Sequence, residues 1–144
     1  MKIHQLSVFL ENKPGRLRAA CAELAAHGLS IVTLSLADTE QFGILRLIME
    51  DWQKAKTALE KAGYVVKVTE VLAIEVDDKP GGLARILDTA SGAGLNIEYM
   101  YAFAEKRGGK AVLVFRFSDP DAALRVLKDG GINVLENVKL FRLA

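Results

Sequence analysis

The segment ENKPGRL at residues 11–17 recurs sixty-six residues later as DDKPGGL at residues 77–83. In each copy an alternating apolar run precedes the proline and an amphipathic run follows it, which predicts a corner between a strand and a helix. The start of a helix presents unpaired N–H groups and a partial positive charge, and a glycine lets a ligand approach the backbone closely. Each corner could therefore bind a carboxylate or a phosphate.

The same corner also has a structural interpretation. Asn12 and Asp78 each stand two residues before a proline. At this position an Asn or Asp side-chain oxygen commonly accepts a backbone N–H of the first helical turn. The corner alone leaves both interpretations open.

Motifs for catalysis are absent from the sequence. It has no G-x-S-x-G, H-E-x-x-H or C-x-x-C motif, no phosphate-binding loop and no Rossmann fingerprint. His4 and His27 have no acid or base partner nearby in the sequence. Cys21 is the single cysteine, which excludes an intrachain disulfide and a Cys-rich zinc site. We expect a protein that is not an enzyme and has no catalytic residue, metal or cofactor.

Composition describes a globular chain with no general charge field. Of its 144 residues, 51% are hydrophobic and 26% are charged, and the formal net charge is +1. This balance suits a folded core and offers no field for nucleic acid or an anionic membrane. The N-terminus lacks the apolar core of a signal peptide, and no apolar run approaches the roughly twenty residues of a membrane span. With one cysteine, these features predict a cytoplasmic protein.

The whole chain is an internal repeat. The offset between the copies is 66 residues up to the second predicted strand and 68 beyond it, because the hairpin of the second copy is two residues longer. The matched pairs include Pro14 and Pro80, Gly28 and Gly94, Ile31 and Ile97, Asp51 and Asp119, and Gly63 and Gly131.

Hydrophobic periodicity predicts the same elements in each copy. The first has a strand around Leu6, Val8 and Leu10, a helix with Pro14 in its first turn, strands at 31–37 and 44–50, a helix capped by Asp51, and a strand at 64–70. The buried stripe of the first helix is predicted as Leu17, Cys21, Leu24 and Ala25, and that of the second as Ala55, Ala58, Leu59 and Ala62.

The second copy repeats this order. It has strands at 71–76, near 95–104 and at 110–117, a helix from Pro80, a helix opened by Asp119 and Pro120, and a last strand from Ile132. Residues 137–143 are expected beside the N-terminal strand. The order βαββαβ predicts an α+β fold of two ferredoxin-like units, each an antiparallel sheet with helices on one face.

Two such units, each with a first strand leading into [N/D]-K-P-G-x-L and a second strand beginning with G-L-[S/N]-I, resemble tandem ACT domains. ACT domains are small-molecule sensing modules that mostly bind amino acids. The resemblance covers roughly residues 3–70 and 71–143, and we place the two ACT domains at 1–70 and 71–144.

Around LENKPG the chain resembles the regulatory domain of phosphoglycerate dehydrogenase. In that family, ACT units pair so that their sheets join side by side, and the effector lies at the seam between them. The corner asparagine of one unit and the asparagine of G-x-N-I of its neighbour hold the ligand. The resemblance therefore implies one site that combines Asn12 with Asn96 and a second that combines Asp78 with Ser30. The second site is expected to be degenerate, because Asp78 would repel a carboxylate and Ser30 is shorter than asparagine.

These implied sites have the following members. The ligand-binding residues are Leu10, Glu11, Asn12, Lys13, Pro14, Gly15, Arg16, Leu17, Asn96 and Ile97. The second site comprises Ser30, Asp78, Pro80, Gly81, Gly82 and Leu83. Leu10 stands where the dehydrogenase family has a histidine, which implies a more apolar pocket. Arg16 faces either an anionic group or solvent.

The resemblance implies a regulatory protein that senses an amino acid at the seam. We expect its output to pass to a metabolic enzyme encoded elsewhere or to its own oligomeric state, with a homodimer as the expected assembly. We expect no nucleic-acid or membrane partner. The alternative is an RNA-binding or purely structural ferredoxin-like module. Tyr99, Tyr101 and Phe103 alternate on a strand, and they could pack an apolar layer or stack on a ligand.

Overall fold

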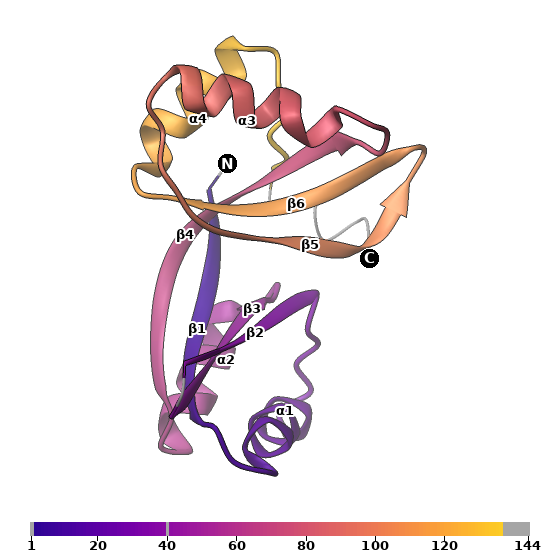
Figure 1. Cartoon of the computed structure of the whole chain (residues 1–144). Coiled ribbons are helices and arrows are strands. Elements are labelled where there is room, and N and C mark those ends of the chain that lie inside the picture. Colours follow the sequence, from indigo (N-terminus) through magenta and orange to yellow (C-terminus); the bar gives the residue numbers. More distant parts are fainter. Residues whose placement is uncertain (1, 40, 137–144) are drawn as a thin grey trace. The chain divides into compact units, whose positions relative to one another are not determined.

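The computed structural model describes residues 2–39 and 41–136, except for the side chains of residues 39 and 104–107. The described residues form two compact units. The N-terminal unit is His4–Thr69, and the C-terminal unit comprises the described residues within Glu70–Ala144 and Met1–Ile3. The elements in chain order are β1 (Ile3–Glu11), α1 (Arg16–Ala26), β2 (Thr33–Thr39), β3 (Phe42–Ile48), α2 (Trp52–Lys61), β4 (Val65–Asp77), α3 (Gly82–Gly92), β5 (Ile97–Arg107), β6 (Lys110–Phe117) and α4 (Pro120–Asp129) (Figure 1).

The N-terminal unit is a sheet with strand order β2-β3-β1-β4. β1 and β2 both pair antiparallel with β3. The alternating residues Leu6, Val8 and Leu10 are buried, as the period of two predicts. They pack in one core with the buried residues of α1 and α2, which are Ala20, Leu24, Ala55 and Leu59.

The C-terminal unit repeats this architecture. The second half of β4 pairs with β6, and β6 pairs with β5, both antiparallel. On the other side of β4, Ile74 pairs with Val134. Figure 1 shows α3 and α4 on one face of this sheet. The predicted α+β fold of two ferredoxin-like βαββαβ units is thus confirmed, and the prediction for residues 137–143 lies outside the described residues.

The two strands predicted at 64–70 and 71–76 form a single strand, β4. It runs from Val65 to Asp77 without interruption and passes from the N-terminal unit into the C-terminal unit near residue 70. The sequence between these points contains no glycine or proline that would break an extended backbone. The limits of the ACT domains at 1–70 and 71–144 stay a prediction.

The prediction that Pro14 and Pro80 lie in the first turn of a helix is wrong. Arg16 N donates to Lys13 O at 3.3 Å, and Gly82 N donates to Lys79 O at 3.1 Å, so each proline lies in a β-turn before the helix. The following glycines have φ/ψ of 85°/−9° at Gly15 and 87°/−8° at Gly81. Proline followed by a glycine at positive φ defines a type II turn, and a residue with positive φ cannot belong to a right-handed helix.

The helix-entry interpretation is wrong for Asn12, whose side chain makes no hydrogen bond to the described residues, and for Asp78 it stays a prediction. The N-cap positions of α1 and α3 are held by Gly15 and Gly81, and neither helix start has a side-chain cap. The buried residues of α1 are Ala20 and Leu24, Leu17 is partly buried against them, and Ala25, predicted on the buried stripe, is exposed.

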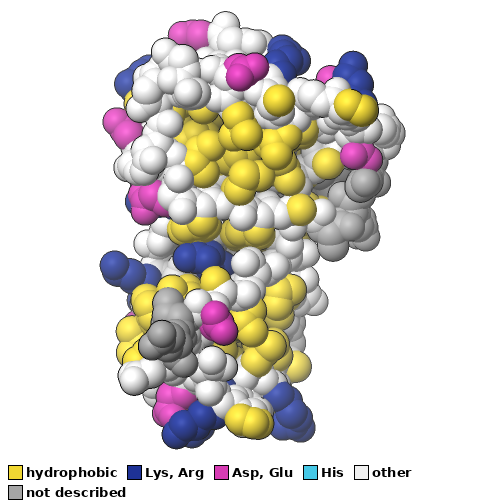
Figure 2. Space-filling model, viewed as in Figure 1, with side chains coloured by type: hydrophobic (Ala, Val, Ile, Leu, Met, Phe, Trp, Pro, Cys, Tyr) yellow, Lys and Arg dark blue, Asp and Glu magenta, His cyan; other side chains and the backbone are white. Residues whose placement is uncertain are grey.

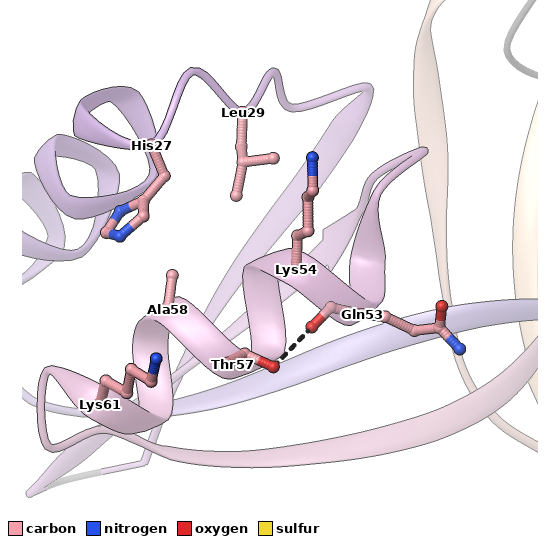
Figure 3. Close-up of a pocket in the computed structure, with 7 residues that line it drawn as sticks. All are labelled: His27, Leu29, Gln53, Lys54, Thr57, Ala58 and Lys61. Atoms are coloured by element: carbon pink, nitrogen blue, oxygen red, sulfur yellow. Dashed lines mark hydrogen bonds between the residues drawn. The ribbon is translucent and has the colours of Figure 1, made fainter.

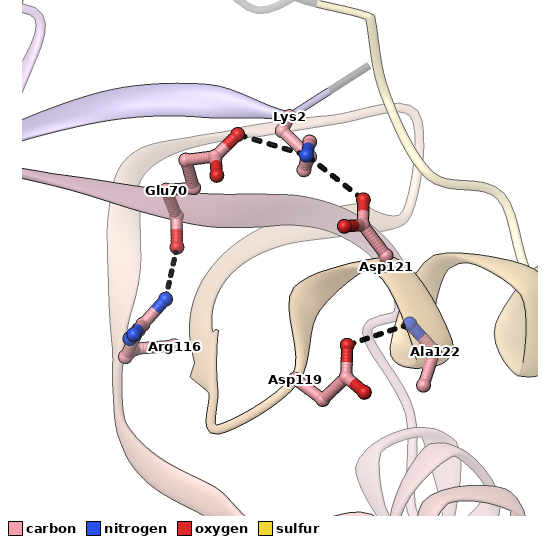
Figure 4. Close-up of polar contacts among 6 residues, drawn as sticks. All are labelled: Lys2, Glu70, Arg116, Asp119, Asp121 and Ala122. Atoms are coloured by element: carbon pink, nitrogen blue, oxygen red, sulfur yellow. Dashed lines mark hydrogen bonds and ion pairs between the residues drawn. The ribbon is translucent and has the colours of Figure 1, made fainter.

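The second helix of each unit has an aspartate at its N-cap, but only one makes the capping bond. Asp119 Oδ1 accepts a hydrogen bond from Ala122 N at 3.1 Å, as Figure 4 shows, and Pro120 opens α4. Asp51 occupies the same position of α2 without a side-chain cap bond. Ala62, predicted on the buried stripe of α2, is the C-cap residue and is exposed.

Lys2 ties the start of the chain to the C-terminal unit. Its Nζ lies 2.9 Å from a carboxylate oxygen of Glu70 and 2.8 Å from one of Asp121 (Figure 4). These bonds raise the pKa of Lys2 and lower the pKa of Asp121. Arg116 donates to the Glu70 backbone oxygen at 3.0 Å, which holds β6 to the same point of β4.

Asp119→Ala is expected to lower the free energy of unfolding by about 1 kcal/mol, the typical value of a side-chain N-cap. The matched variant Asp51→Ala removes no cap bond and is expected to cost less than about half as much. Urea denaturation of both variants measures the difference. Equal losses at the two positions would contradict the assignment of the caps.

Gly82→Ala is expected to destabilise the protein by about 1–3 kcal/mol, the usual cost of overpacking. A Cβ at Gly82 would lie 2.0 Å from the Asp77 carbonyl oxygen. Gly92→Ala at the other end of α3 is the control, because its Cβ would meet no atom within 4 Å. This control is expected to be neutral or stabilising, since alanine favours helices. Denaturant unfolding measures both, and wild-type stability of Gly82→Ala would contradict the close approach.

Candidate functional site

Each corner is fixed to the hairpin of its own unit by the same backbone bond. Asn12 N donates to Gln41 O at 3.1 Å, and Asp78 N donates to Gly109 O at 2.9 Å. In both corners the next amide N–H, of the lysine, bonds back to the last residue of the strand at 2.9 Å. Both corners therefore have the same backbone, so any difference in ligand binding comes from side chains.

The first corner presents a neutral amide beside cations. The Asn12 side chain is exposed and makes no hydrogen bond to the part of the chain that the structure describes. Lys13 lies 3.1 Å from the Glu11 carboxylate and Arg16 lies 3.9 Å from it. Lys13 is the main cause that lowers the pKa of Glu11, and Arg16 lowers this pKa further. Arg16 thus faces an anionic group of its own corner, and Asn12 keeps a free donor and a free acceptor.

The second corner presents carboxylates. Lys110 bonds to Asp77 and is the main cause that lowers the pKa of Asp77, while Asp77 raises the pKa of Lys110. Lys79 adds a weaker contact to Asp77 at 4.0 Å. Asp78, Pro80 and Leu83 line a hollow of about 460 Å³ beside this pair. A ligand carboxylate entering this hollow would meet the Asp78 carboxylate.

The residues around the starts of β2 and β5 also differ in charge between the two copies. Asn96, just before β5, donates from Nδ2 to Ser118 Oγ at 2.9 Å, and Ser118 N donates to Asn96 O at 3.0 Å. Ser30, before β2, lines a hollow of about 200 Å³ together with Glu50 and Asp51. The position of Ser118 is taken by Glu50 in the first copy. Asn96 is therefore held in place by a neutral partner, whereas Ser30 stands among carboxylates.

Three of the remaining predicted site residues have side chains in or against the cores of their units. Leu10 is 4% exposed and contributes its side chain to the core, while Leu17 and Ile97 pack against the cores of their units. Asn12 and Ser30 belong to the N-terminal unit, and Asp78 and Asn96 belong to the C-terminal unit. The pairing of Asn12 with Asn96, and that of Asp78 with Ser30, stay predictions.

Sequence reasoning missed a hollow of about 450 Å³ in the N-terminal unit, between the end of α1 and α2 (Figure 3). Its lining includes His27, Leu29 and the two lysines Lys54 and Lys61. The spacing of seven residues that places both lysines on one face of α2 was the available signal. Exposed lysines of an amphipathic helix are ordinarily interpreted as its solvated face.

Residues 2–39 and 41–136 offer neither a metal-binding cluster nor a membrane-spanning helix. These residues contain no group of three or more histidine, cysteine, aspartate or glutamate side chains that could hold a metal ion. None of their helices combines the length and the apolar composition needed to cross a membrane.

Two βαββαβ units with paired Pro-Gly corners define the ACT class of domain. The family model of the ACT domain pair matches residues 1–144, so the chain belongs to this family. No curated protein matches the chain.

Solved structures with a similar fold cover nearly the whole chain. Protein BT0572 from Bacteroides thetaiotaomicron is 39% identical, with a TM-score of 0.91, and the match covers 98% of this chain and 96% of that chain. The ligand-free regulatory subunit of aspartate kinase from Thermus thermophilus is 16% identical, with a TM-score of 0.64 and coverage of 90% and 93%. The corresponding subunit from Thermus flavus is 17% identical, with a TM-score of 0.60 and the same coverage.

Lys110→Met is expected to lower stability in a pH-dependent way. Asp77 has a pKa below its ordinary value of 3.8, so its contribution is present above that value and is lost as the pH falls through the folded pKa. Lys110 has a pKa above its ordinary value of 10.5, so its contribution is lost as the pH rises through the folded pKa. The variant should therefore be less stable than the wild type at pH of about 7, and the two should converge at pH of about 2. Urea unfolding at both pH values measures this, and a gap independent of pH would contradict the ion pair.

Proposed function

We propose that this chain is a non-catalytic regulatory protein that senses an amino acid. The observation that carries the proposal is the first corner, where a rigid type II turn presents the unbonded Asn12 side chain beside Lys13 and Arg16. Membership of the ACT domain pair family supports a ligand-sensing role. The aspartate kinase structures of the same fold are regulatory subunits, which agrees with this role.

The proposed ligand site is a seam between two ACT units, with Asn12 on one side and Asn96 on the other. An amino acid needs a donor for its carboxylate and an acceptor for its ammonium group, and an amide side chain offers both. The Asn96 Nδ2 donates to Ser118 Oγ, and its Oδ1 can accept a hydrogen bond from the ammonium group of the ligand. Asn12 and the nearby cations then suit the carboxylate.

The opposite combination, Asp78 with Ser30, is proposed to be degenerate. Asp78 carries the charge of the group it would have to bind, and Ser30 shares its hollow with Glu50 and Asp51. Like charges repel, so both positions disfavour a ligand carboxylate. One ligand per pair of units is therefore the proposed stoichiometry.

The proposed output is a change of assembly or of a partner protein. A ligand shifts such an equilibrium only by its differential affinity for the two states. Edge strand β2 exposes Leu34 at 45% and Leu36 at 51%, and Met100 of edge strand β5 is 36% exposed. Figure 2 shows hydrophobic side chains at the surface of both units. Such exposed apolar residues support association with a second copy or with a metabolic enzyme.

The RNA-binding alternative has less support. Stacking on bases needs exposed aromatic side chains on the sheet. Phe103 is 5% exposed, and Tyr99 and Tyr101 of the same strand are half-buried. Gly109 and Ala111 occupy the positions where an RNA-recognition strand would carry its aromatic residues.

Thermal-shift screening of the full chain against the twenty amino acids is expected to show stabilisation by at least one. A ligand at a hundredfold its dissociation constant stabilises the folded state by about 2.7 kcal/mol. Asn12→Ala is expected to abolish the shift, because it removes the proposed donor and acceptor.

Asp78→Ala is the matched control, since it changes the equivalent residue of the other corner. It is expected to leave the shift intact. Equal losses in the two variants would contradict a one-sided site, and the absence of a shift with every amino acid would contradict the ligand class.

A further inference from the structure

The hollow between α1 and α2 has an apolar floor and cationic ends. Figure 3 shows Ala58 pointing from α2 toward Leu29 and His27, with Lys54 on one side of it and Lys61 on the other. Ala58 is buried and Leu29 packs against the core, so the middle of the hollow offers apolar contact. All of these residues belong to the N-terminal unit.

The two lysines keep their charges available. Seven residues of α-helix span about 10 Å, so Lys54 and Lys61 stand about two turns apart on one face. Neither lysine has a carboxylate partner among the residues that the structure describes, whereas Lys56 of the same helix pairs with Glu60 at 2.8 Å. The prediction that His27 has no acidic partner nearby is wrong, because the carboxylate of Glu23 lies 3.6 Å from His27 Nδ1, whose ring also bonds to the Glu23 backbone oxygen.

The internal repeat shows that the fold does not require this arrangement. At the equivalent positions of the C-terminal unit, Lys54 becomes Ala122, Lys61 becomes Asp129 and His27 becomes Ala93. Ala58 becomes Val126, a larger side chain at the position of the floor. The second copy has the same helices without either lysine, although Arg125 stands at the position of Thr57, so the pair of lysines two turns apart is a property of the first copy alone.

We propose that this hollow binds a small aliphatic dicarboxylate. One carboxylate pairs with each lysine, and the methylene chain lies on Ala58 and Leu29. Two cations about two helical turns apart match two anionic ends, and the apolar floor matches the carbon chain between them. This site lies on the helical layer and is separate from the Asn12 corner.

NMR titration of the full ¹⁵N-labelled chain tests the proposal, with glutarate as the probe. The expected result is a saturable shift of amide signals at Leu29 and within residues 54–61. Glutaramide has the same carbon chain without charge and is expected to leave these signals unchanged. Lys54→Ala/Lys61→Asp gives the first copy the residues of the second and is expected to weaken binding at least about tenfold, which is about 1.4 kcal/mol.

Matched controls separate the hollow from other effects. Lys67→Gln removes an exposed lysine of the same unit outside the hollow and is expected to bind glutarate as the wild type does. Asn12→Ala is expected to leave the glutarate-dependent shifts of Leu29 and of residues 54–61 unchanged, because Asn12 does not line the hollow. Should the aspartate variant disturb α2, Lys54→Gln/Lys61→Gln removes both charges while keeping good helix formers.

Three results would overturn the proposal. They are equal binding of glutaramide, wild-type affinity of both double variants, and equally tight binding of inorganic phosphate. The last result would indicate an unselective anion site in place of a dicarboxylate pocket.

Discussion

The Pro-Gly turn at the end of the first strand of each unit is the constraint on which the rest depends. It places a glycine at positive φ immediately before a helix and ties the corner amide to the hairpin through one backbone hydrogen bond. The helix start, the strand end and the hairpin are thereby held together at one point. Side chains on such a corner are presented by a backbone that hydrogen bonds hold in place, and a preorganised backbone lowers the entropic cost of binding.

Divergence between the copies occurs on this common frame. Where the first corner has Asn12 and Arg16, the second has Asp78 and Gly82, and the close approach of the Asp77 carbonyl to Gly82 leaves no room for a Cβ. The helical layers have diverged as well, since Lys61 of the first copy is replaced by Asp129. The two copies therefore share the backbone geometry of the corner and differ in the charged side chains that they carry.

Periodicity was sufficient to predict the order of the elements except that β4 replaces two predicted strands, because strand and helix faces both follow from which residues are buried. It failed at Pro14, since a Pro-Gly pair suits both a helix start and a type II turn, and only the φ of Gly15 separates the two. Periodicity also assigned Ala25 instead of Ala20 to the buried stripe of α1, because alanines occur on both sides of Leu24 at helical spacing. The lysine-lined hollow was missed because its residues come from two helices whose contact no local pattern shows. The proposed pairing of Asn12 with Asn96 depends on how two units associate, which the periodicity of a single unit does not predict.

A crystal structure of the full chain with a stabilising amino acid would test the central claim most directly. The account predicts one ligand whose carboxylate and ammonium groups lie within about 3 Å of the side chains of Asn12 and Asn96, contributed by two different ACT units. A ligand bound beside Asp78 and Ser30, or within a single unit away from both asparagines, would contradict it.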